Sequence, residues 1–258
     1  METIPEYEAR VLASPARPDL IEGIIPTGPQ YSILAGRPGL GKSILGLQMA
    51  FCVATGTNFL GLRVQQGRVG YIGYEGTQHK TLERINKIKT AFPDVGTNLK
   101  LEPDPLHYKL PKRQNDLINI MQDMDLLIID PLKYFVIGDY TKPLFAQAAI
   151  GTLIVALQKT NTACVIIHHV RKRDPRTRVD PDDLSEVKGA GDYVEGATSV
   201  ILMEQIRQGH AEDGTFSPAS KDIMRLYFPK TRDAIADVLP MTIQLNRTHL
   251  IFEREGLC

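Results

Sequence analysis

Short apolar runs alternate with longer stretches of helical length from about residue 30 onward. The first run, Tyr31–Ala35, precedes a glycine-rich loop and an apolar segment that is predicted as a helix over Ser43–Ala54. The same alternation continues along the chain and predicts these further elements: a strand at Arg68–Tyr74, a helix at Thr77–Ala91 with Thr77 as N-cap, a short strand at Asn98–Glu102, a helix at Asn115–Met124, a strand at Asp125–Asp130, a helix at Lys142–Thr160, strands at Thr162–His168, Ala197–Met203 and Met224–Pro229, and a hairpin of Met241–Leu245 with His249–Glu253.

Two of these strands carry almost no polar residue. Leu126–Ile129 and Cys164–Ile167 are apolar throughout, which is typical of a parallel sheet covered by helices on both faces. Strands that alternate with helices in this way predict a doubly wound α/β fold with a mostly parallel central sheet and flanking helices.

The remaining segments set the expected boundaries. Residues 1–28 are rich in proline and are predicted as an N-terminal lead-in with a short helix near Tyr7–Leu12, before an α/β domain over residues 29–258. The stretches Arg171–Gly191 and Gln208–Lys221 are too long for ordinary connections, so each is a functional loop or disordered.

Composition limits the possibilities only slightly. In 258 residues, 30 basic side chains balance 30 acidic ones, so net charge neither indicates nor excludes a nucleic-acid partner. Cys52, Cys164 and Cys258 are far apart and predict neither a disulfide framework nor a zinc site. The N-terminus lacks an apolar signal core, and no apolar run approaches the ~18 residues needed to cross a bilayer, so a cytoplasmic protein without a membrane partner is expected.

The loop after the first strand matches the phosphate-binding pattern G-x-x-x-x-G-K-[ST]. It reads Gly36, Arg37, Pro38, Gly39, Leu40, Gly41, Lys42 and Ser43. Glycines let the backbone wrap around phosphate oxygens, and the positive end of the next helix dipole faces them. Lys42 is expected to reach the β- and γ-phosphates of ATP, and the Ser43 hydroxyl to ligate Mg²⁺.

Two acidic residues lie at the ends of predicted strands. Asp130 ends the apolar strand at Leu126–Ile129, in the form of a Walker B strand, and is expected to hold Mg²⁺ through a water. Pro131 follows it where some P-loop classes carry a catalytic glutamate, so the group that polarises the attacking water is sought elsewhere. The candidate is Glu75, at the end of the strand at Val69–Tyr74.

These residues, together with the segment Glu22–Gly28, resemble the RecA-like group that contains plasmid RepA-type hexameric helicases and many phage and plasmid ATPases. The ATPase domain of DnaB-type replicative helicases is a more distant likeness. The resemblance extends from about Leu20 to Arg232. It implies a RecA-like P-loop fold, with Glu75 in the place of the catalytic glutamate.

The resemblance also implies two further elements of the site. His168 and His169 match a polar strand ending that senses the γ-phosphate; they point to opposite faces, so one of them is expected to face the nucleotide. Lys230-Thr231-Arg232 resembles a Lys-x-Arg element whose side chains reach the γ-phosphate held by the neighbouring subunit, which implies a homo-oligomeric ring, a hexamer in that group.

A basic stretch directly follows the two histidines. Its charged members are Arg171, Lys172, Arg173, Arg176 and Arg178. The resemblance places this loop in a ring channel, where it would contact the phosphates of single-stranded nucleic acid. A solvated loop that serves only solubility is the alternative, since acidic residues follow at Asp180, Asp182, Asp183 and Glu186.

The sequence therefore predicts a Mg²⁺-dependent ATPase that couples hydrolysis to movement on single-stranded DNA, as a replicative helicase or translocase of a plasmid, virus or mobile element. Two alternatives stay open. One is a recombination or repair ATPase that forms a filament on DNA, and the other is a nucleotide-gated regulator that acts on a protein partner.

Overall fold

The computed structural model describes residues 1–13, 17–73, 76–102, 104, 109–170, 184–187, 191–210, 216–218, 221–232 and 238–256. Its helices are α1 (Ile4–Ala13), α2 (Lys42–Thr55), α3 (Gln78–Lys89), α4 (Gln114–Met121), α5 (Leu132–Phe135), α6 (Pro143–Thr160) and α7 (Asp192–Gly196), with a 3₁₀ turn at Leu184–Glu186. Its strands are β1 (Tyr31–Gly36), β2 (Val69–Gly73), β3 (Leu99–Leu101), β4 (Leu126–Asp130), β5 (Ala163–His169), β6 (Ser199–Gln205), β7 (Arg207–His210), β8 (Phe216–Pro218), β9 (Ile223–Thr231), β10 (Met241–Asn246) and β11 (Ile251–Arg254).

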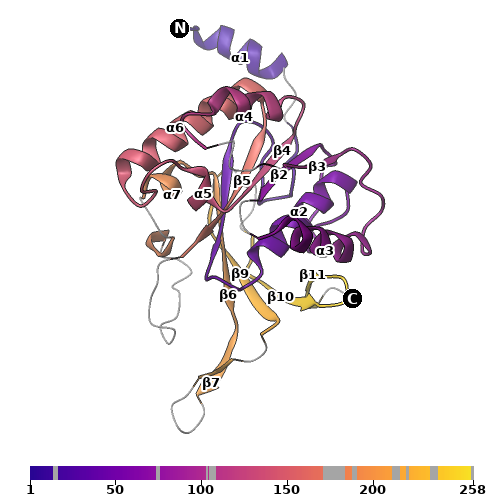
Figure 1. The fold of residues 1–258 in the computed structure, drawn as a ribbon. Helices are drawn as coiled ribbons and strands as arrows, with labels where there is room; N and C mark the ends of the chain where they lie inside the picture. The colour runs from indigo at the N-terminus through magenta and orange to yellow at the C-terminus, as the bar shows by residue number, and fades with distance from the viewer. Residues whose placement is uncertain are drawn as a thin grey trace.

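A single large sheet organises the molecule, and its strands run in the order β11-β10-β9-β6-β1-β5-β4-β2-β3 (Figure 1). From β3 to β6 every pairing is parallel, whereas β9, β10 and β11 add to the β6 edge in antiparallel fashion. The predicted mostly parallel α/β sheet with a C-terminal hairpin is therefore confirmed.

Helices cover both faces of this sheet, as Figure 1 shows, with α2 and α3 on one face and α4, α6 and α7 on the other. Each face has its own apolar core, because residues along each strand alternate between the two. On β5, Val165 and Ile167 belong to the core beneath α2, while Cys164 and Ile166 belong to the core beneath α6.

The helix ends follow from local chemistry. Thr77 caps α3 as predicted, its side chain accepting a hydrogen bond from the Lys80 N–H. The helix α2 ends at Gly56, which adopts φ 73° and donates its N–H to the Cys52 carbonyl. The helix α6 begins with Pro143 and ends at Asn161, also in the left-handed region.

The N-terminal segment has two parts. Leu20, Ile21, Ile24 and Ile25 are fully buried in the core beneath α2. The helix α1, by contrast, buries none of its residues and extends beyond the body of the molecule (Figure 1).

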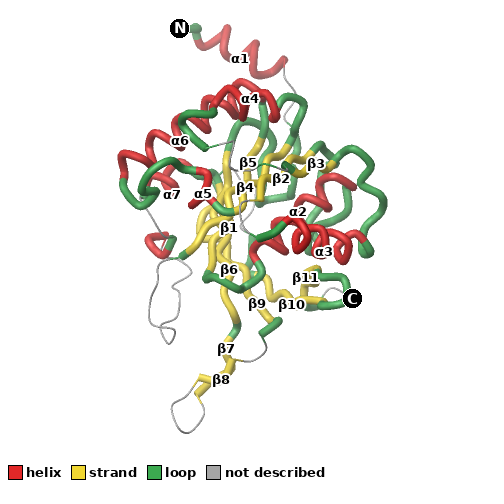
Figure 2. Tube along the Cα trace, in the orientation of Figure 1, coloured by secondary structure: helices red, strands yellow, loops and turns green. Residues whose placement is uncertain are grey.

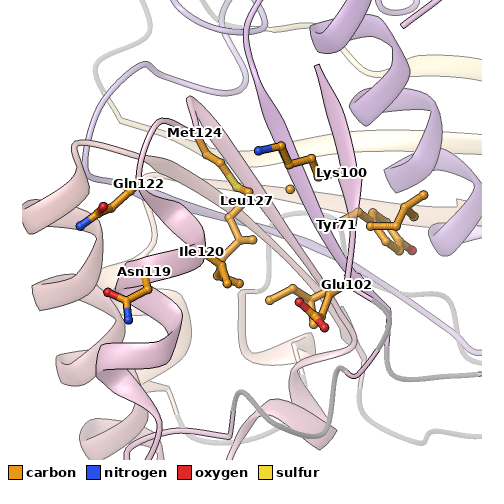
Figure 3. A pocket seen from close by; sticks show the side chains of 11 residues that line it. Tyr71, Lys100, Glu102, Asn119, Ile120, Gln122, Met124 and Leu127 are labelled. Carbon is orange, nitrogen blue, oxygen red and sulfur yellow. The ribbon is translucent and has the colours of Figure 1, made fainter. Parts of the chain in front are cut away.

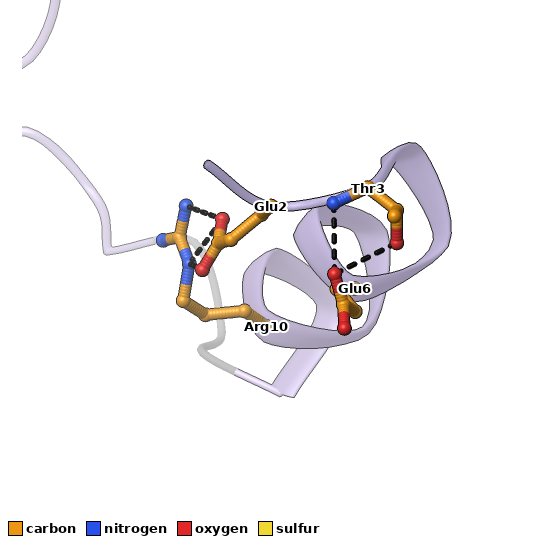
Figure 4. Close-up of polar contacts among 4 residues, drawn as sticks. All are labelled: Glu2, Thr3, Glu6 and Arg10. Carbon is orange, nitrogen blue, oxygen red and sulfur yellow. Dashed lines mark hydrogen bonds and ion pairs between the residues drawn. The ribbon is translucent and has the colours of Figure 1, made fainter.

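Local polar contacts stabilise α1 (Figure 4). The Thr3 N–H and hydroxyl both donate to the Glu6 carboxylate at 2.8 Å, the first of these bonds being one half of a capping box, and these hydrogen bonds lower the pKa of the Glu6 carboxyl. Arg10 pairs with Glu2 at 3.0 Å.

Some elements differ from the sequence-based expectation. A two-stranded ribbon of β7 and β8 projects from the end of the large sheet (Figure 2), and all but its first residue lies in the stretch Gln208–Lys221, which was expected to be a functional loop or disordered. The short helices α5 and α7 were not predicted, because four or five residues are too few to show a helical period. Among the helices of the described ranges, none combines the length and hydropathy that a membrane span requires.

Candidate functional site

The phosphate loop connects the end of β1 to the start of α2. Gly39 and Gly41 have φ angles of 82° and 92°, a region that side chains disfavour, and Gly41 is the N-cap of α2. The loop therefore turns sharply and directs the first N–H groups of α2 toward the space that it encloses.

Glycine is also required where this loop meets neighbouring strands. A Cβ atom at Gly36 would lie 2.6 Å from the backbone oxygen of Met203 on β6. A Cβ atom at Gly41 would lie 2.9 Å from the ring of Phe252 on β11. At Gly36 the clash would be with a backbone atom of a neighbouring strand, which cannot move aside as a side chain can, so the structure leaves no room for a side chain at this position.

The Lys42 side chain folds back across the loop that precedes it. It is only 5% exposed, and its Nζ atom donates to the Arg37 carbonyl at 2.8 Å. The Lys42 ammonium group is therefore held at the mouth of the loop, where its hydrogen bond to the carbonyl oxygen can be replaced by one to a phosphate oxygen. Ser43 is the next residue and is half-buried at the first turn of α2.

The C-terminal hairpin supports the phosphate loop from outside. The Gln48 side chain on α2 donates to the Phe252 carbonyl at 2.8 Å and accepts from the Phe252 N–H at 2.7 Å. Sequence reasoning missed this contact, although a glutamine within an otherwise apolar helix indicated that a buried polar partner was needed.

Asp130 lies at the carboxyl end of β4, two strands from the phosphate loop. Its side chain is 5% exposed and accepts a hydrogen bond of 2.5 Å from the Tyr71 hydroxyl on β2. Burial, followed by the charge of Asp130, raises the pKa of Tyr71 well above its ordinary value, so the phenol remains the donor. Tyr71 was not among the predicted site residues.

The two histidines at the end of β5 lie beside β1 and point to opposite faces. His168 is fully buried, with edge-on contacts to Tyr140 at 5.8 Å and Tyr193 at 5.9 Å between ring centroids. His169 pairs with Gly36 of the phosphate loop and is directed toward the α2 face, like Val165 and Ile167. Of the two predicted sensors, His169 therefore lies on the same face of the sheet as α2, the helix that follows the phosphate loop.

Lys230 and Arg232, at the end of β9, contact the C-terminus of α7. Lys230 Nζ donates to the Val194 carbonyl at 2.5 Å and to the Glu195 carbonyl at 2.9 Å, and Arg232 donates to the same Glu195 carbonyl at 3.0 Å. Partial burial, with a smaller contribution from Arg232, lowers the pKa of Lys230. The two cations thus bind together to the negative end of one short helix.

Other predicted residues lie outside the part of the chain that the structure describes. They are Glu75 and the basic residues Arg171, Lys172, Arg173, Arg176 and Arg178.

A pocket of about 290 Å³ lies away from the phosphate loop, between β2, β3 and the end of α4 (Figure 3). Its polar lining comes from Lys100, Glu102, Asn119 and Gln122, and none of the predicted site residues contributes to it. Tyr71 contributes to its wall, but its side chain points away from this pocket, toward the opposite face of the sheet (Figure 3).

The residues around the loop are suited to Mg²⁺ and a nucleoside triphosphate. The loop offers N–H donors and a buried ammonium to phosphate oxygens, while Ser43 and Asp130 offer the oxygen ligands that Mg²⁺ prefers. No group of three His, Cys, Asp or Glu side chains that could hold a metal occurs among the described residues. A Mg²⁺ ion bound largely through phosphates and water needs no such group.

Comparison with known proteins agrees with this geometry. A family model described as an AAA domain matches residues 6–175. Among curated proteins, no match was found. The crystal structure of the RadB recombinase is similar, with a TM-score of 0.56 and 12% identity over 88% of this chain and 91% of that one.

The structure of a DnaB-like replicative helicase, described with its interactions with primase, is also similar. Its TM-score is 0.63 at 13% identity, over 98% of this chain and 67% of that one. Identities this low show a shared RecA-like fold, whereas the family model covers more than half of the chain. This chain belongs to the AAA domain family and is a RecA-like P-loop ATPase.

Proposed function

We propose that this chain is a Mg²⁺-dependent ATPase of the plasmid RepA-type group that assembles as a ring of six subunits. In this proposal it moves along single-stranded DNA as a replicative helicase or translocase of a plasmid, virus or mobile element. The observation that carries the proposal is the pairing of His169 with Gly36, because the basic stretch begins two residues after His169. A conformational change of the phosphate loop would therefore be transmitted to the basic stretch at residues 171–178 through the C-terminal end of β5.

Each subunit would supply part of the ATP site. Lys42 and the loop N–H groups would bind the phosphates, and Ser43 and Asp130 would hold Mg²⁺, which neutralises charge on the β- and γ-phosphates when bound. Glu75 would orient and deprotonate the attacking water, and His169 would contact the γ-phosphate. The basic residues at 171–178 would bind successive phosphates of a single strand.

The neighbouring subunit would complete the site with Lys230 and Arg232. A guanidinium supplied in trans stabilises the charge that develops on the transferring phosphoryl group. In the isolated chain both side chains are bound to the α7 carbonyls. They would have to exchange these carbonyls for phosphate oxygens when the ring closes.

The mass of the assembled protein tests the ring. The monomer is 28.7 kDa. With a nonhydrolysable ATP analogue and a single-stranded oligonucleotide, native mass spectrometry is expected to give a species of about six chains with one strand bound. The matched control is the same mixture without nucleotide, in which that species is expected to be depleted.

Two results would contradict the ring. A chain that stays monomeric in every mixture would remove the shared site. Open assemblies that lengthen with the oligonucleotide would favour the alternative of a recombination or repair ATPase that forms a filament.

A further inference from the structure

Tyr71 and Asp130 are brought together by the register of β2 and β4. Tyr71 pairs with Ile128, and Gly73 pairs with Asp130, so the tyrosine lies one diagonal step from the aspartate. A long aromatic side chain can span this step. Its hydroxyl reaches Asp130 Oδ2 at 2.5 Å.

Gly73 leaves room for this contact. A Cβ atom at Gly73 would lie 3.0 Å from Cε1 of Tyr71, so the ring passes over this residue on its way to Asp130. Because Gly73 has no side chain, the Tyr71 phenol can therefore reach from β2 across to Asp130 on β4.

The contact meets the needs of a buried carboxylate. Asp130 is 5% exposed and Tyr71 is 4% exposed, so water has little access to the charge. A buried carboxylate is costly unless donors compensate it, and an O–H donor to a charged oxygen is among the shorter and stronger hydrogen bonds. The Tyr71 hydroxyl is such a donor, and it also limits rotation of the carboxylate plane.

We propose that Tyr71 is a positioning residue for the metal site: it holds the Asp130 carboxylate in the orientation that binds Mg²⁺ with the nucleotide. This inference rests on the proposed role of Asp130 as a Mg²⁺ ligand. Groups that orient a metal ligand affect metal affinity even though they do not touch the metal. Tyr71 is on β2, which is separated from β1 and its phosphate loop by β5 and β4, so we expect its effect to be on the metal and not on the nucleotide itself.

The test separates metal binding from stability. A fluorescent ADP analogue is bound to Tyr71→Phe protein, first in EDTA and then with increasing Mg²⁺, and the Mg²⁺ midpoint is recorded together with the melting temperature. We expect the affinity for ADP in EDTA to be unchanged and the Mg²⁺ midpoint to rise about tenfold.

Tyr31→Phe is the matched control. Tyr31 is also buried, and its hydroxyl donates to the Tyr193 carbonyl at 2.8 Å, far from Asp130 in the sheet. This variant also loses one buried hydrogen bond, and we expect it to lower the melting temperature without moving the Mg²⁺ midpoint.

The Asp130→Asn variant tests the metal role of Asp130 separately from the positioning role of Tyr71. If this variant raises the Mg²⁺ midpoint and Tyr71→Phe does not, the positioning role is wrong while the proposed metal site stands. If Asp130→Asn itself leaves the midpoint unchanged, the metal role of Asp130 fails, and the inference fails with it.

Should Tyr71→Phe not fold, Gly73→Ala tests the same geometry. Its added Cβ atom would lie 3.0 Å from the Tyr71 ring and require the ring to shift by a few tenths of an ångström, and we expect the Mg²⁺ midpoint to rise in the same direction. An unchanged midpoint in a folded Gly73→Ala protein would overturn the positioning role.

Discussion

Replacing Lys42 with alanine is expected to reduce ATP hydrolysis by at least about 100-fold. The ammonium group is held at the mouth of the phosphate loop, where it would stabilise negative charge on the β- and γ-phosphates. Alanine is the best helix former, and its introduction at the first position of α2 removes a nearly buried charge, so the melting temperature is not expected to fall. Steady-state phosphate release together with thermal unfolding measures both effects.

Lys159→Ala is the control for this variant. Lys159 is exposed near the end of α6, just before β5 begins, and so lies at the opposite end of the sheet from the phosphate loop. Its removal should leave hydrolysis unchanged. A Lys42→Ala protein that turns over ATP at the wild-type rate would show that this loop is not the catalytic site.

Arg232→Ala is expected to lower hydrolysis by about 1000-fold, the lower range for loss of an arginine that acts on the transferring phosphoryl group. Nucleotide binding should survive, because Arg232 lies away from the phosphate loop of its own chain and contacts Glu195 of α7. Measuring both the rate of ATP hydrolysis and the affinity for a nonhydrolysable ATP analogue tests whether hydrolysis is lost while nucleotide binding is kept. Arg225→Ala, an exposed arginine earlier on the same strand, is the control that should retain activity.

Mixing the two inactive variants shows which subunit supplies the arginine. In a ring that forms from equal amounts of Lys42→Ala and Arg232→Ala chains, about a quarter of the sites would combine an intact loop with an intact arginine from the neighbour. Activity should therefore reappear on mixing. If the mixture stays as inactive as its components, Arg232 does not act across an interface.

Much of this fold can be predicted from the order of apolar runs. The central runs of β4 and β5, Leu126–Ile129 and Cys164–Ile167, are apolar throughout because helices cover both faces of the sheet, and that pattern is visible in the sequence. The phosphate loop is equally visible, because its glycines and lysine have fixed spacing.

Contacts between distant segments could not be predicted in the same way. Tyr71 reaches Asp130, and Gln48 reaches Phe252, only because particular strand registers and a particular hairpin position bring them together. The sequence indicates that a buried polar tip needs a partner but does not identify the partner. Likewise, successive residues of a strand point to opposite faces, so the sequence predicts that His168 and His169 lie on different faces of the sheet. Which of the two faces the loop depends on the face that α2 covers, and this comes only from the structure.

The rate of ATP hydrolysis with and without single-stranded DNA tests the central claim most directly. If the basic stretch binds the strand and is coupled through the end of β5 to the phosphate loop, the strand should increase hydrolysis several-fold. That increase should weaken as salt rises, because phosphate contacts are salt-dependent. Unchanged hydrolysis, together with no binding of the strand at low salt, would contradict the translocase and favour a nucleotide-gated regulator of a protein partner.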